Sequence, residues 1–519
     1  MDTAPMTPGR YAEQCPERPA IVMGATGEVV TYQQLEQRSR AFARGLRRRG
    51  LGVGDHLAIL AENTRSFLEI AWAAQRSGLY YTAINRHLRR AEVQYILDDC
   101  GARALVATAA MNDVVAGLDL DRMAVQICAD GELDGFECYD EILAAESAES
   151  ADPLPGECEG REMLYSGGTT GRPKGVRKPL PATALGDPEA APVQIARGLL
   201  VAGAREDAVY LSPAPLYHAA PLVFAMSWQR LGATVVVMER FDPRLWLSLV
   251  ERHRVTHTQM VPTMFVRLLR LPAEQRRGHD VSSLIDVVHS AAPCPVPVKR
   301  QMLDWLGPIV NEYYSGTEDV GNTYISAREW LEHPGSVGRP AQRCHIVGDD
   351  GREVAAGQTG VVYFEGGRPF EYHNDPERTA AASGPHGWRT LGDIGHVDAA
   401  GYLYLTDRQS HMIVSGGVNI YPQEAENVLA AHPAVLDVAV IGVPDEEMGE
   451  QVKAVVQPVD PAAAGPELAV ALIAACRAEL AHYKCPRTVD FTVDLPRDPN
   501  GKLYKRLLRQ RYRSGEHLT

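Results

Sequence analysis

The chain has 519 residues, of which 45% are hydrophobic and 23% charged, and its formal net charge at pH 7 is −14. This length exceeds what one hydrophobic core usually organises, so at least two domains are expected. A strongly negative chain without a segregated run of Lys and Arg repels a polyphosphate backbone, which argues against nucleic acid as a partner.

Two further features bear on the compartment. Residues 1–14 lack the basic start and apolar block of a secretory signal, and no later segment approaches the roughly 20 apolar residues of a membrane span. Nine cysteines are scattered without a C-x-x-C pair, which argues against a metal or disulfide framework and suits a reducing compartment. We therefore expect a cytoplasmic protein without a membrane span.

The first four hundred residues alternate short apolar runs with helical patterns. Residues 31–50 begin with a capping-box pair, Thr31 and Gln34, and end at a glycine, which predicts a helix. Apolar runs that predict strands follow at residues 56–60, 103–108 and 234–238. A further helix is predicted at residues 244–253. This order is typical of parallel strands joined by crossover helices. Loops are predicted for the glycine-, alanine- and proline-rich stretches at residues 50–54, 144–152 and 179–192.

The pattern changes from Gly392. Residues 395–408 alternate apolar and polar side chains around a turn at Asp398–Gly401, which predicts a hairpin. Beyond it we predict a helix that starts near Pro466 and three strands, at residues 437–443, 451–459 and 489–493.

The fold class expected is therefore α/β. A large N-terminal domain of mixed sheets with crossover helices is predicted for residues 1–407, and a small, mobile α+β domain for residues 411–519. Residues 408–410 are the predicted hinge between them.

A glycine-rich loop spans Tyr165–Gly175, with the sequence Tyr-Ser-Gly-Gly-Thr-Thr-Gly-Arg-Pro-Lys-Gly. Glycines let backbone N–H groups turn toward phosphate oxygens, while three hydroxyl side chains add donors and Lys174 adds a positive charge. It is not a Walker A loop, because Lys174 is followed by Gly175 instead of Ser or Thr. The Thr-Thr-Gly-x-Pro-Lys-Gly order predicts a phosphate-binding loop, with a flexible surface turn as the alternative.

This loop resembles the phosphate-binding signature of the adenylate-forming superfamily, which includes acyl-CoA synthetases, peptide-synthetase adenylation domains and luciferases. The resemblance implies a phosphate-binding set for ATP: Ser166, Gly168, Thr169, Thr170, Gly171 and Lys174. It further implies two steps, in which a carboxylic acid and ATP form an acyl-adenylate and the thiol of coenzyme A then displaces AMP. Thr169 is included among the implied catalytic residues.

Two motifs resemble the family's nucleotide-binding segments. Tyr314-Ser-Gly-Thr-Glu318 resembles the aromatic-Gly-x-Thr-Glu motif, with serine at its first glycine. The resemblance implies that Tyr314 stacks on adenine, Thr317 meets the phosphate, and Glu318 is catalytic and holds Mg²⁺. Gly387 through Asp393 resembles the ribose motif, which implies that Asp393 binds the ribose hydroxyls with help from Arg408.

Two C-terminal motifs complete the resemblance. Gly416 and Gly417 resemble the loop that lines the pantetheine tunnel for coenzyme A. The stretch from Pro496 to Lys502 resembles the catalytic-lysine motif, which implies that Lys502 is the cation that stabilises charge during adenylation. The resemblance also implies that the small domain rotates about Ser410 between the two steps.

The acyl pocket is the least determined part of the site. His218 stands where this family commonly places an aromatic residue beside the substrate carboxylate, so it is a candidate both for catalysis and for the pocket, although a lone histidine is often a core residue. The other pocket candidates are apolar or small: Phe224, Trp228, Ala291, Ala292, Gly316 and Gly321. They indicate an apolar, roomy site for a medium-chain or bulky acid. The segment from Ala83 to Leu88 resembles the bacterial fatty-acyl and steroid-acyl branch of the family. This resemblance implies that polycyclic and terpenoid acids are also candidate substrates.

The chain departs from the family pattern at two functional positions. Gly167 stands where Ser or Thr is usual, and Ser410 where Asp or Lys is usual. A hydrogen bond to a charged group contributes roughly 1.5–3 kcal/mol, so loss of one donor to ATP slows adenylation about 10- to 150-fold if nothing compensates. An alternative is therefore an enzyme that performs only thioesterification, on an acyl-adenylate supplied by a separate adenylating enzyme.

Two other functions are weighed against the acyl-CoA synthetase. A stand-alone amino-acid adenylating enzyme is one, but no amino-acid-binding Asp stands out in the sequence. A non-enzymatic adenylate sensor is the other, and it should have lost the catalytic lysine, whereas Lys502 is present. Homodimers are common in the resembled family, and the sequence leaves the oligomeric state open.

Overall fold

The computed structural model describes residues 5–149, 154–166, 173–201, 203–205, 207–408, 411–416, 418–497 and 503–513. The chain folds into two compact units, each built from separate stretches of sequence. Unit 1 comprises Met1–Met260, Leu271–Val288 and Pro369–Thr379, and unit 2 comprises Val261–Arg270, His289–Arg368 and Ala380–Thr519. This division differs from the predicted domains, whose boundary at residues 408–410 stays a prediction.

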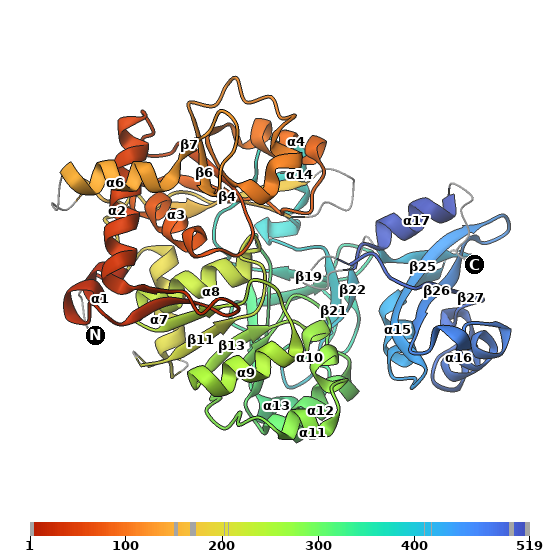
Figure 1. Ribbon diagram of the computed structural model, residues 1–519. Helices are drawn as coiled ribbons and strands as arrows, with labels where there is room; N and C mark the ends of the chain where they lie inside the picture. Colours follow the sequence, from red (N-terminus) through yellow and green to blue (C-terminus); the bar gives the residue numbers. More distant parts are fainter. Residues whose placement is uncertain are drawn as a thin grey trace. The chain divides into compact units, whose positions relative to one another are not determined.

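Unit 1 contains a six-stranded parallel sheet (Figure 1). Its strands, in spatial order, are β7 (Glu137–Cys138), β6 (Val125–Asp130), β5 (Ala102–Thr108), β3 (His56–Leu60), β4 (Tyr80–Ala83) and β8 (Arg161–Glu162). Along β3, Leu57 and Ile59 enter one core, and Ala58 and Leu60 enter the other. Burial on both faces explains why the predicted strands at residues 56–60 and 103–108 are almost wholly apolar.

Helices cover this sheet on both faces: α2 (Tyr32–Arg48), α3 (Arg65–Arg76), α4 (Arg90–Cys100) and α6 (Tyr139–Glu149). The predicted helix at residues 31–50 is α2, and its capping box is present. The amide of Gln34 donates to Thr31 Oγ1 at 3.2 Å, and the amide of Thr31 donates to Gln34 Oε1 at 2.9 Å. The loop predicted at residues 144–152 is wrong through residue 149, because α6 continues there and buries Ile142, Leu143 and Glu146.

A second sheet of unit 1 has mixed direction. It includes, in this order, β13 (His257–Met260), β11 (Val209–Ser212), β12 (Thr234–Val237), β1 (Pro19–Met23) and β2 (Val29–Thr31), and among these five β2 alone runs antiparallel to its neighbour. The predicted strand at residues 234–238 is β12, and the predicted helix at residues 244–253 is α9 (Pro243–His253). The remaining longer helices of this unit are α1 (Pro8–Gln14), α7 (Ala191–Val201) and α8 (Ala219–Arg230).

Unit 2 begins with α10 (Pro262–Leu269) and resumes at His289, the last residue of β14 (Asp286–His289), whose other residues belong to unit 1. It continues with α12 (Val296–Leu306) and the strands β15 (Val310–Ser315), β16 (Asn322–Ile325) and β17 (Arg339–Pro340). A four-stranded antiparallel sheet follows, in the order β18 (Cys344–Val347), β19 (Gly360–Phe364), β21 (Asp393–Val397) and β22 (Leu403–Arg408). The strands β21 and β22 are the predicted hairpin, with its turn at Asp398–Gly401.

The C-terminal part of unit 2 is a small α+β fold, as predicted (Figure 1). Its sheet has the order β24 (Val418–Ile420), β23 (Ile413–Ser415), β26 (Gly449–Pro458) and β25 (Val435–Asp445), and β27 (Thr488–Phe491) pairs in parallel with β26. Side chains of β25 alternate between two cores. Val438 and Val440 pack with α15 (Pro422–Ala430) and α16 (Pro466–Glu479), whereas Ala439 and Ile441 pack with α17 (Lys505–Arg513).

In the ranges that the structure describes, no helix has both the length and the apolar content to cross a bilayer. The short helices not yet named are α5 (Asn112–Val115), α11 (Ala273–Arg277), α13 (Ala327–Glu332) and α14 (Pro376–Ala381).

A buried ion pair joins α2 to α3. The side chain of Arg76 is fully buried, and its Nη2 lies 2.5 Å from Glu36 Oε2, while its Nη1 lies 2.8 Å from Glu157 Oε1. Burial alone would raise the pKa of the Glu36 carboxyl, but the charge and hydrogen bonds of Arg76 outweigh burial, so this pKa is lowered. The stabilisation from Glu36 is therefore complete above its unfolded pKa of about 4.3 and is lost as the pH falls through the lower folded pKa.

Replacing Glu36 with Gln should lower the melting temperature at neutral pH by about 3–6 °C, because it leaves the buried Arg76 with one anionic partner instead of two. The difference in melting temperature between the wild type and Glu36→Gln should narrow between about pH 5 and pH 3, since acid also removes the Glu36 charge from the wild type. Differential scanning calorimetry across this range measures it. A difference that stays constant or widens on acidification would contradict the assignment.

Candidate active site

A strand pair brings the two ends of the predicted phosphate loop together. β9 (Leu164–Ser166) and β10 (Lys174–Arg177) are antiparallel, with Lys174 directly opposite Ser166. The Lys174 Nζ lies 5.1 Å from the centre of the Tyr372 ring, on the neighbouring strand β20 (Glu371–Tyr372). The other loop candidates, Gly168, Thr169, Thr170 and Gly171, lie outside the described residues, as does Gly167.

The base of this hairpin is held by a buried ion pair. Glu162, in β8, precedes β9, and Lys178 follows β10 directly. The Lys178 Nζ donates to Glu162 Oε1 at 2.8 Å, and both side chains are more than nine-tenths buried. The charges of Lys178 and Arg161 outweigh burial and lower the pKa of the Glu162 carboxyl. The ends of the loop are thereby fixed without using Lys174.

The predicted adenine motif lies at the end of β15. Tyr314 is paired with Thr323 of β16, and the turn between these strands carries Thr317 and Glu318. The turn is closely packed, because a Cβ on Gly316 would lie 2.7 Å from Leu391 and one on Gly321 would lie 2.2 Å from the Phe364 ring. Both glycines were predicted to line the acyl pocket; in the structure they are also positions where neighbouring side chains approach the backbone.

A hydrogen bond joins the adenine motif to the ribose motif. The Tyr314 hydroxyl donates to Asp393 Oδ2 at 2.5 Å, and Asp393 is only 5% exposed. Asp393 opens β21 and stands directly opposite Arg408, the last residue of β22. The structure thus brings together Tyr314, Asp393 and the backbone of Arg408, which are separated by long stretches of sequence.

The Mg²⁺ candidate fits a single-carboxylate site. Glu318 is partly exposed on the turn after β15. Among the residues that the structure describes, no group of three or more His, Cys, Asp or Glu side chains could hold a metal ion by itself. Mg²⁺ is usually bound through one or two carboxylates, with waters and substrate phosphates as the other ligands. Glu318 would therefore hold the ion together with the phosphates of ATP, whose negative charge the ion would neutralise.

The three aromatic pocket candidates of unit 1 lie on α8 or directly before it. His218 is the residue before α8, and its ring lies 4.6 Å from that of Tyr217. Phe224 and Trp228, one turn apart on α8, both stack on Tyr210, at 6.4 Å and 5.7 Å between ring centres. Trp228 is 2% exposed and packs in the core, so its predicted role as a pocket wall stays a prediction.

The small pocket candidates of unit 2 follow β14. Ala291 is exposed and Ala292 is partly exposed. Ala291 has a φ of +75°, which is in the left-handed region that side chains other than glycine rarely adopt. Such strain persists only where the surroundings hold the backbone in place.

Of the two glycines in the predicted coenzyme A loop, the structure describes Gly416. Gly416, between β23 and β24, has a φ of +57°, and its amide donates to the Met448 carbonyl at 2.8 Å. A Cβ there would meet the flexible end of the Met448 side chain, and the left-handed φ favours glycine at this position. Gly417, the hinge residue Ser410 and the catalytic candidate Lys502 lie outside the described residues.

Sequence reasoning missed two side chains that contact this region. Leu391 lies inside the ribose motif, but the motif does not reveal that its side chain packs on Gly316. Phe364 lies on β19, 6.3 Å from the Tyr314 ring between centres, and no local pattern marks it. Both contacts are long-range, so only the fold could have revealed them.

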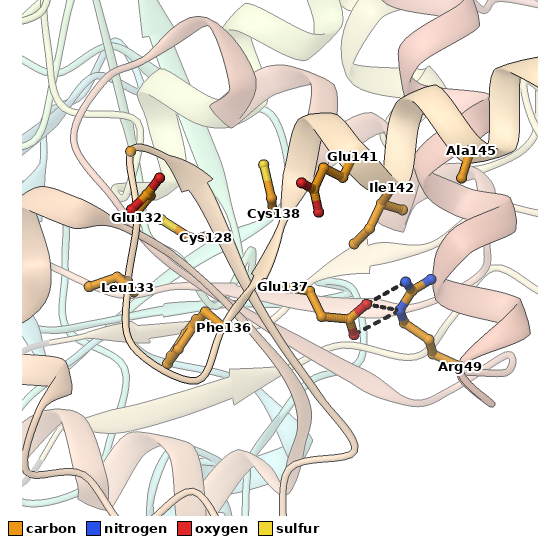
Figure 2. A pocket seen from close by; sticks show the side chains of 11 residues that line it. Arg49, Cys128, Glu132, Leu133, Phe136, Glu137, Cys138, Glu141, Ile142 and Ala145 are labelled. Carbon is orange, nitrogen blue, oxygen red and sulfur yellow. Dashed lines mark hydrogen bonds and ion pairs between the residues drawn. The ribbon is translucent and has the colours of Figure 1, made fainter.

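A cavity of about 450 Å³ lies elsewhere in unit 1, beside β6, β7 and α6 (Figure 2). Its lining includes Glu132, Glu137 and Glu141, and Arg49 forms an ion pair with Glu137, with Nη2 2.5 Å from Oε2. None of the predicted site residues lines it. Its charged lining residues are three glutamates and one arginine, a balance that disfavours a nucleotide phosphate, so we do not assign the candidate site there.

Comparison with known proteins gives consistent matches. The model of the AMP-binding enzyme family matches residues 9–370, and that of the AMP-binding enzyme C-terminal domain matches residues 424–502. The chain belongs to the AMP-binding enzyme family.

Relatives place this AMP-binding enzyme in the acyl-CoA ligase branch, and a solved structure of an amide bond synthetase is also similar to it. A feruloyl-CoA synthase of an Amycolatopsis species is 34% identical over 511 residues, which cover 97% of this chain and 98% of that protein. A (7a-methyl-dioxo-octahydroindenyl)propanoyl:CoA ligase of Rhodococcus jostii is 32% identical, with 98% of each chain covered. The structure of the amide bond synthetase McbA from Marinactinospora thermotolerans matches with a TM-score of 0.81 at 28% identity, covering 97% of this chain and 99% of that one.

The predicted fold class and family are thereby confirmed. This AMP-binding enzyme is an acid–thiol ligase of the adenylate-forming superfamily, and it uses ATP, Mg²⁺ and coenzyme A. The roles of its individual site residues stay predictions.

Replacing Tyr314 with Phe should weaken AMP binding about tenfold or more, because Asp393 loses the donor that orients its carboxylate. Isothermal titration calorimetry with AMP measures the change. Tyr404→Phe is the matched control, since the Tyr404 hydroxyl donates to Asp398 Oδ2 at 3.3 Å at the other end of the same hairpin. AMP affinity should change less than about twofold in this control. Equal effects of the two substitutions would show that Tyr314 has no special role.

Proposed function

We propose that this enzyme activates a bulky, largely apolar carboxylic acid as its acyl-adenylate and then transfers the acyl group to coenzyme A. The observation that carries the proposal is the hydrogen bond from Tyr314 to Asp393. It joins the two motifs that are predicted to bind the adenine and the ribose of one nucleotide. The register of Asp393 with Arg408 adds the second predicted ribose ligand.

The phosphates of ATP are assigned to the hairpin of β9 and β10. Ser166 and Lys174 stand opposite each other at its end, so a hydroxyl donor and an ammonium group can act on the same polyphosphate. In the first step, the substrate carboxylate attacks the α-phosphorus and pyrophosphate leaves. Lys502 is the proposed cation for the charge that develops, and His218 is proposed to face the substrate carboxylate.

In the second step, the sulfur of coenzyme A attacks the acyl carbonyl carbon and AMP leaves. The loop at Gly416 and Gly417 is proposed to line the path of the pantetheine. We propose that the C-terminal domain, residues 411–519, rotates about Ser410 between the steps, so that this loop replaces Lys502 at the reaction centre.

The substrate class is inferred from the residues expected around the acyl group. Ala291 and Ala292 are small and accessible, and Phe224 offers an apolar, partly exposed ring. The relatives named above include ligases for an aromatic acid and for a bicyclic acid. A medium-chain, aromatic or polycyclic acid, terpenoid acids included, is therefore proposed. The nine cysteines are all free thiols, which supports a reducing, cytoplasmic location.

Gly167 favours one alternative, in which the enzyme performs only thioesterification on a supplied acyl-adenylate. A glycine there offers the phosphates no hydroxyl donor. Under this alternative, a separate adenylating enzyme supplies the first step.

The decisive assay supplies coenzyme A with a panel of aliphatic, aromatic and polycyclic acids, in one arm as free acid with MgATP and in the other as preformed acyl-adenylate. Mass spectrometry should detect acyl-CoA in both arms, because Lys174, Asp393 and Lys502 retain the groups that adenylation needs. Product from the adenylate arm alone would favour the thioesterification enzyme. Product in neither arm, with every acid, would overturn the proposed function.

Replacing Ala292 with Leu should raise KM for a polycyclic acid about tenfold or more and leave KM for a short aliphatic acid within about twofold, because the added volume narrows the pocket. Ala399→Leu, on the exposed turn after β21, is the control and should leave both values unchanged. Steady-state kinetics with the two acids provides the comparison. An equal effect on both acids would remove Ala292 from the pocket.

A further inference from the structure

A buried carboxylate lies beneath the segment that carries Ala291 and Ala292. Glu312, on β15, is 5% exposed. Its Oε2 lies 2.5 Å from the Nζ of Lys299, on α12, and 3.3 Å from the Nε2 of His289, at the end of β14. Lys299 and His289 are both fully buried. The Glu312 carboxylate therefore contacts His289 and Lys299, the first and last residues of the segment that carries the two alanines.

Other contacts hold the same three side chains. The Lys299 Nζ lies 4.8 Å from the centre of the Trp330 ring, and the Phe265 ring meets that of His289 edge-on at 5.2 Å. Within the segment itself, the Cys294 thiol lies within electrostatic reach of both Glu312 and Lys299. Glu312 thus contacts both ends of the His289 to Lys299 segment.

Burial dominates the titration of these groups. It lowers the pKa of His289 well below its usual value, and the nearby Lys299 charge adds to this, so His289 is neutral. Burial also raises the pKa of Glu312 and lowers that of Lys299, while the attraction between these two opposes both shifts. An ion pair in such a place contributes little net stability, because well-packed apolar residues usually serve as well. A role in fixing one local conformation is therefore the better explanation.

Ala291 has the backbone conformation that the surrounding contacts must stabilise. A φ of +75° is unfavourable for alanine, and a relaxed segment would leave it. The anchors at His289 and Lys299 lie on either side of Ala291, and Ser290 hydrogen-bonds the Tyr313 side chain, which follows Glu312 on β15.

We propose that Glu312 is a positioning residue for acid recognition, holding His289 and Lys299 so that Ala291 and Ala292 form the wall against the acyl group. This inference rests on the proposed function, because it takes these alanines as part of the acyl pocket. Glu312 itself touches neither substrate nor nucleotide. Its loss should weaken binding of the acyl group and leave binding of AMP nearly unchanged.

The test compares the affinities of two ligands, AMP and a non-reactive acyl-sulfamoyl adenosine that carries the acid converted best by the wild type. In Glu312→Gln, Kd for the acyl analogue should rise about tenfold, while Kd for AMP changes less than about twofold. Glu36→Gln is the matched control, because it also removes the charge of a buried glutamate paired with a cation, at the α2–α3 contact of unit 1. It should change neither Kd.

A second substitution separates positioning from general destabilisation. Glycine tolerates the left-handed region, so Ala291→Gly reduces the need for an anchor. In the Ala291→Gly background, Glu312→Gln should raise Kd for the acyl analogue by about threefold or less. An equal rise in both backgrounds, a parallel loss of AMP affinity, or an unchanged Kd in Glu312→Gln would each overturn the inference.

A variant that does not fold and a wrong proposed function give different results. If Glu312→Gln does not fold, the paired replacement of Lys299 by Met and Glu312 by Leu removes both charges together, and the same ratio of affinities decides. A wild type that binds no acyl analogue of any acid in the panel would overturn the proposed function and this inference with it. A wild type that binds the analogue while the variant binds it equally well would overturn this inference alone.

Discussion

A buried carboxylate must have a hydrogen-bond donor, and in this protein that requirement connects the nucleotide motifs. Asp393 is almost fully buried, and leaving it without a donor would cost on the order of 1–3 kcal/mol or more. The Tyr314 hydroxyl meets this need at 2.5 Å. The bond fixes the end of β15 against the start of β21, and β21 in turn fixes Asp393 opposite Arg408. The adenine motif, the ribose motif and Arg408 are thereby held together.

Most lysines of this chain also have charged partners. Only seven occur in the chain, and five of them form ion pairs with carboxylates: Lys178, Lys299, Lys453, Lys484 and Lys505. The other two, Lys174 and Lys502, belong to the phosphate-loop motif and the C-terminal motif. Lys178 holds the base of the phosphate hairpin, and Lys299 holds the segment of Ala291. Lys178 and Lys299 therefore act on loop conformation, whereas the catalytic roles of Lys174 and Lys502 are those proposed above.

Features set by neighbouring residues could be predicted from the sequence. The capping box of Thr31 and Gln34, the hairpin at Asp398–Gly401 and the strands of the C-terminal fold are all present, because turn chemistry and periodicity act locally. The helix through residues 144–149 was missed, since its alanines and glutamates give almost no amphipathic pattern, and packing of α6 against α2 decides its state.

The arrangement of the site could be predicted only in part. Family motifs named Tyr314, Asp393 and Arg408, but nothing in the sequence says that Tyr314 donates to Asp393. Glu312 and Lys299 were overlooked for a similar reason, because isolated charges usually mark solvated surface and only the fold buries these two. The sequence also does not show that Trp228, a predicted pocket wall, is buried against Tyr210. Long-range packing, which no local pattern records, accounts for each of these differences.

The central claim is that the acid's own carboxylate oxygen bonds to the α-phosphorus of ATP. The most direct test uses an acid labelled with ¹⁸O in both carboxylate oxygens, a single turnover with ATP and coenzyme A, and mass spectrometry of the nucleotide products. Attack on the α-phosphorus transfers one labelled oxygen, so the account predicts AMP carrying a single ¹⁸O and unlabelled pyrophosphate. Label in inorganic phosphate with ADP as the product would show attack on the γ-phosphorus and would contradict the account.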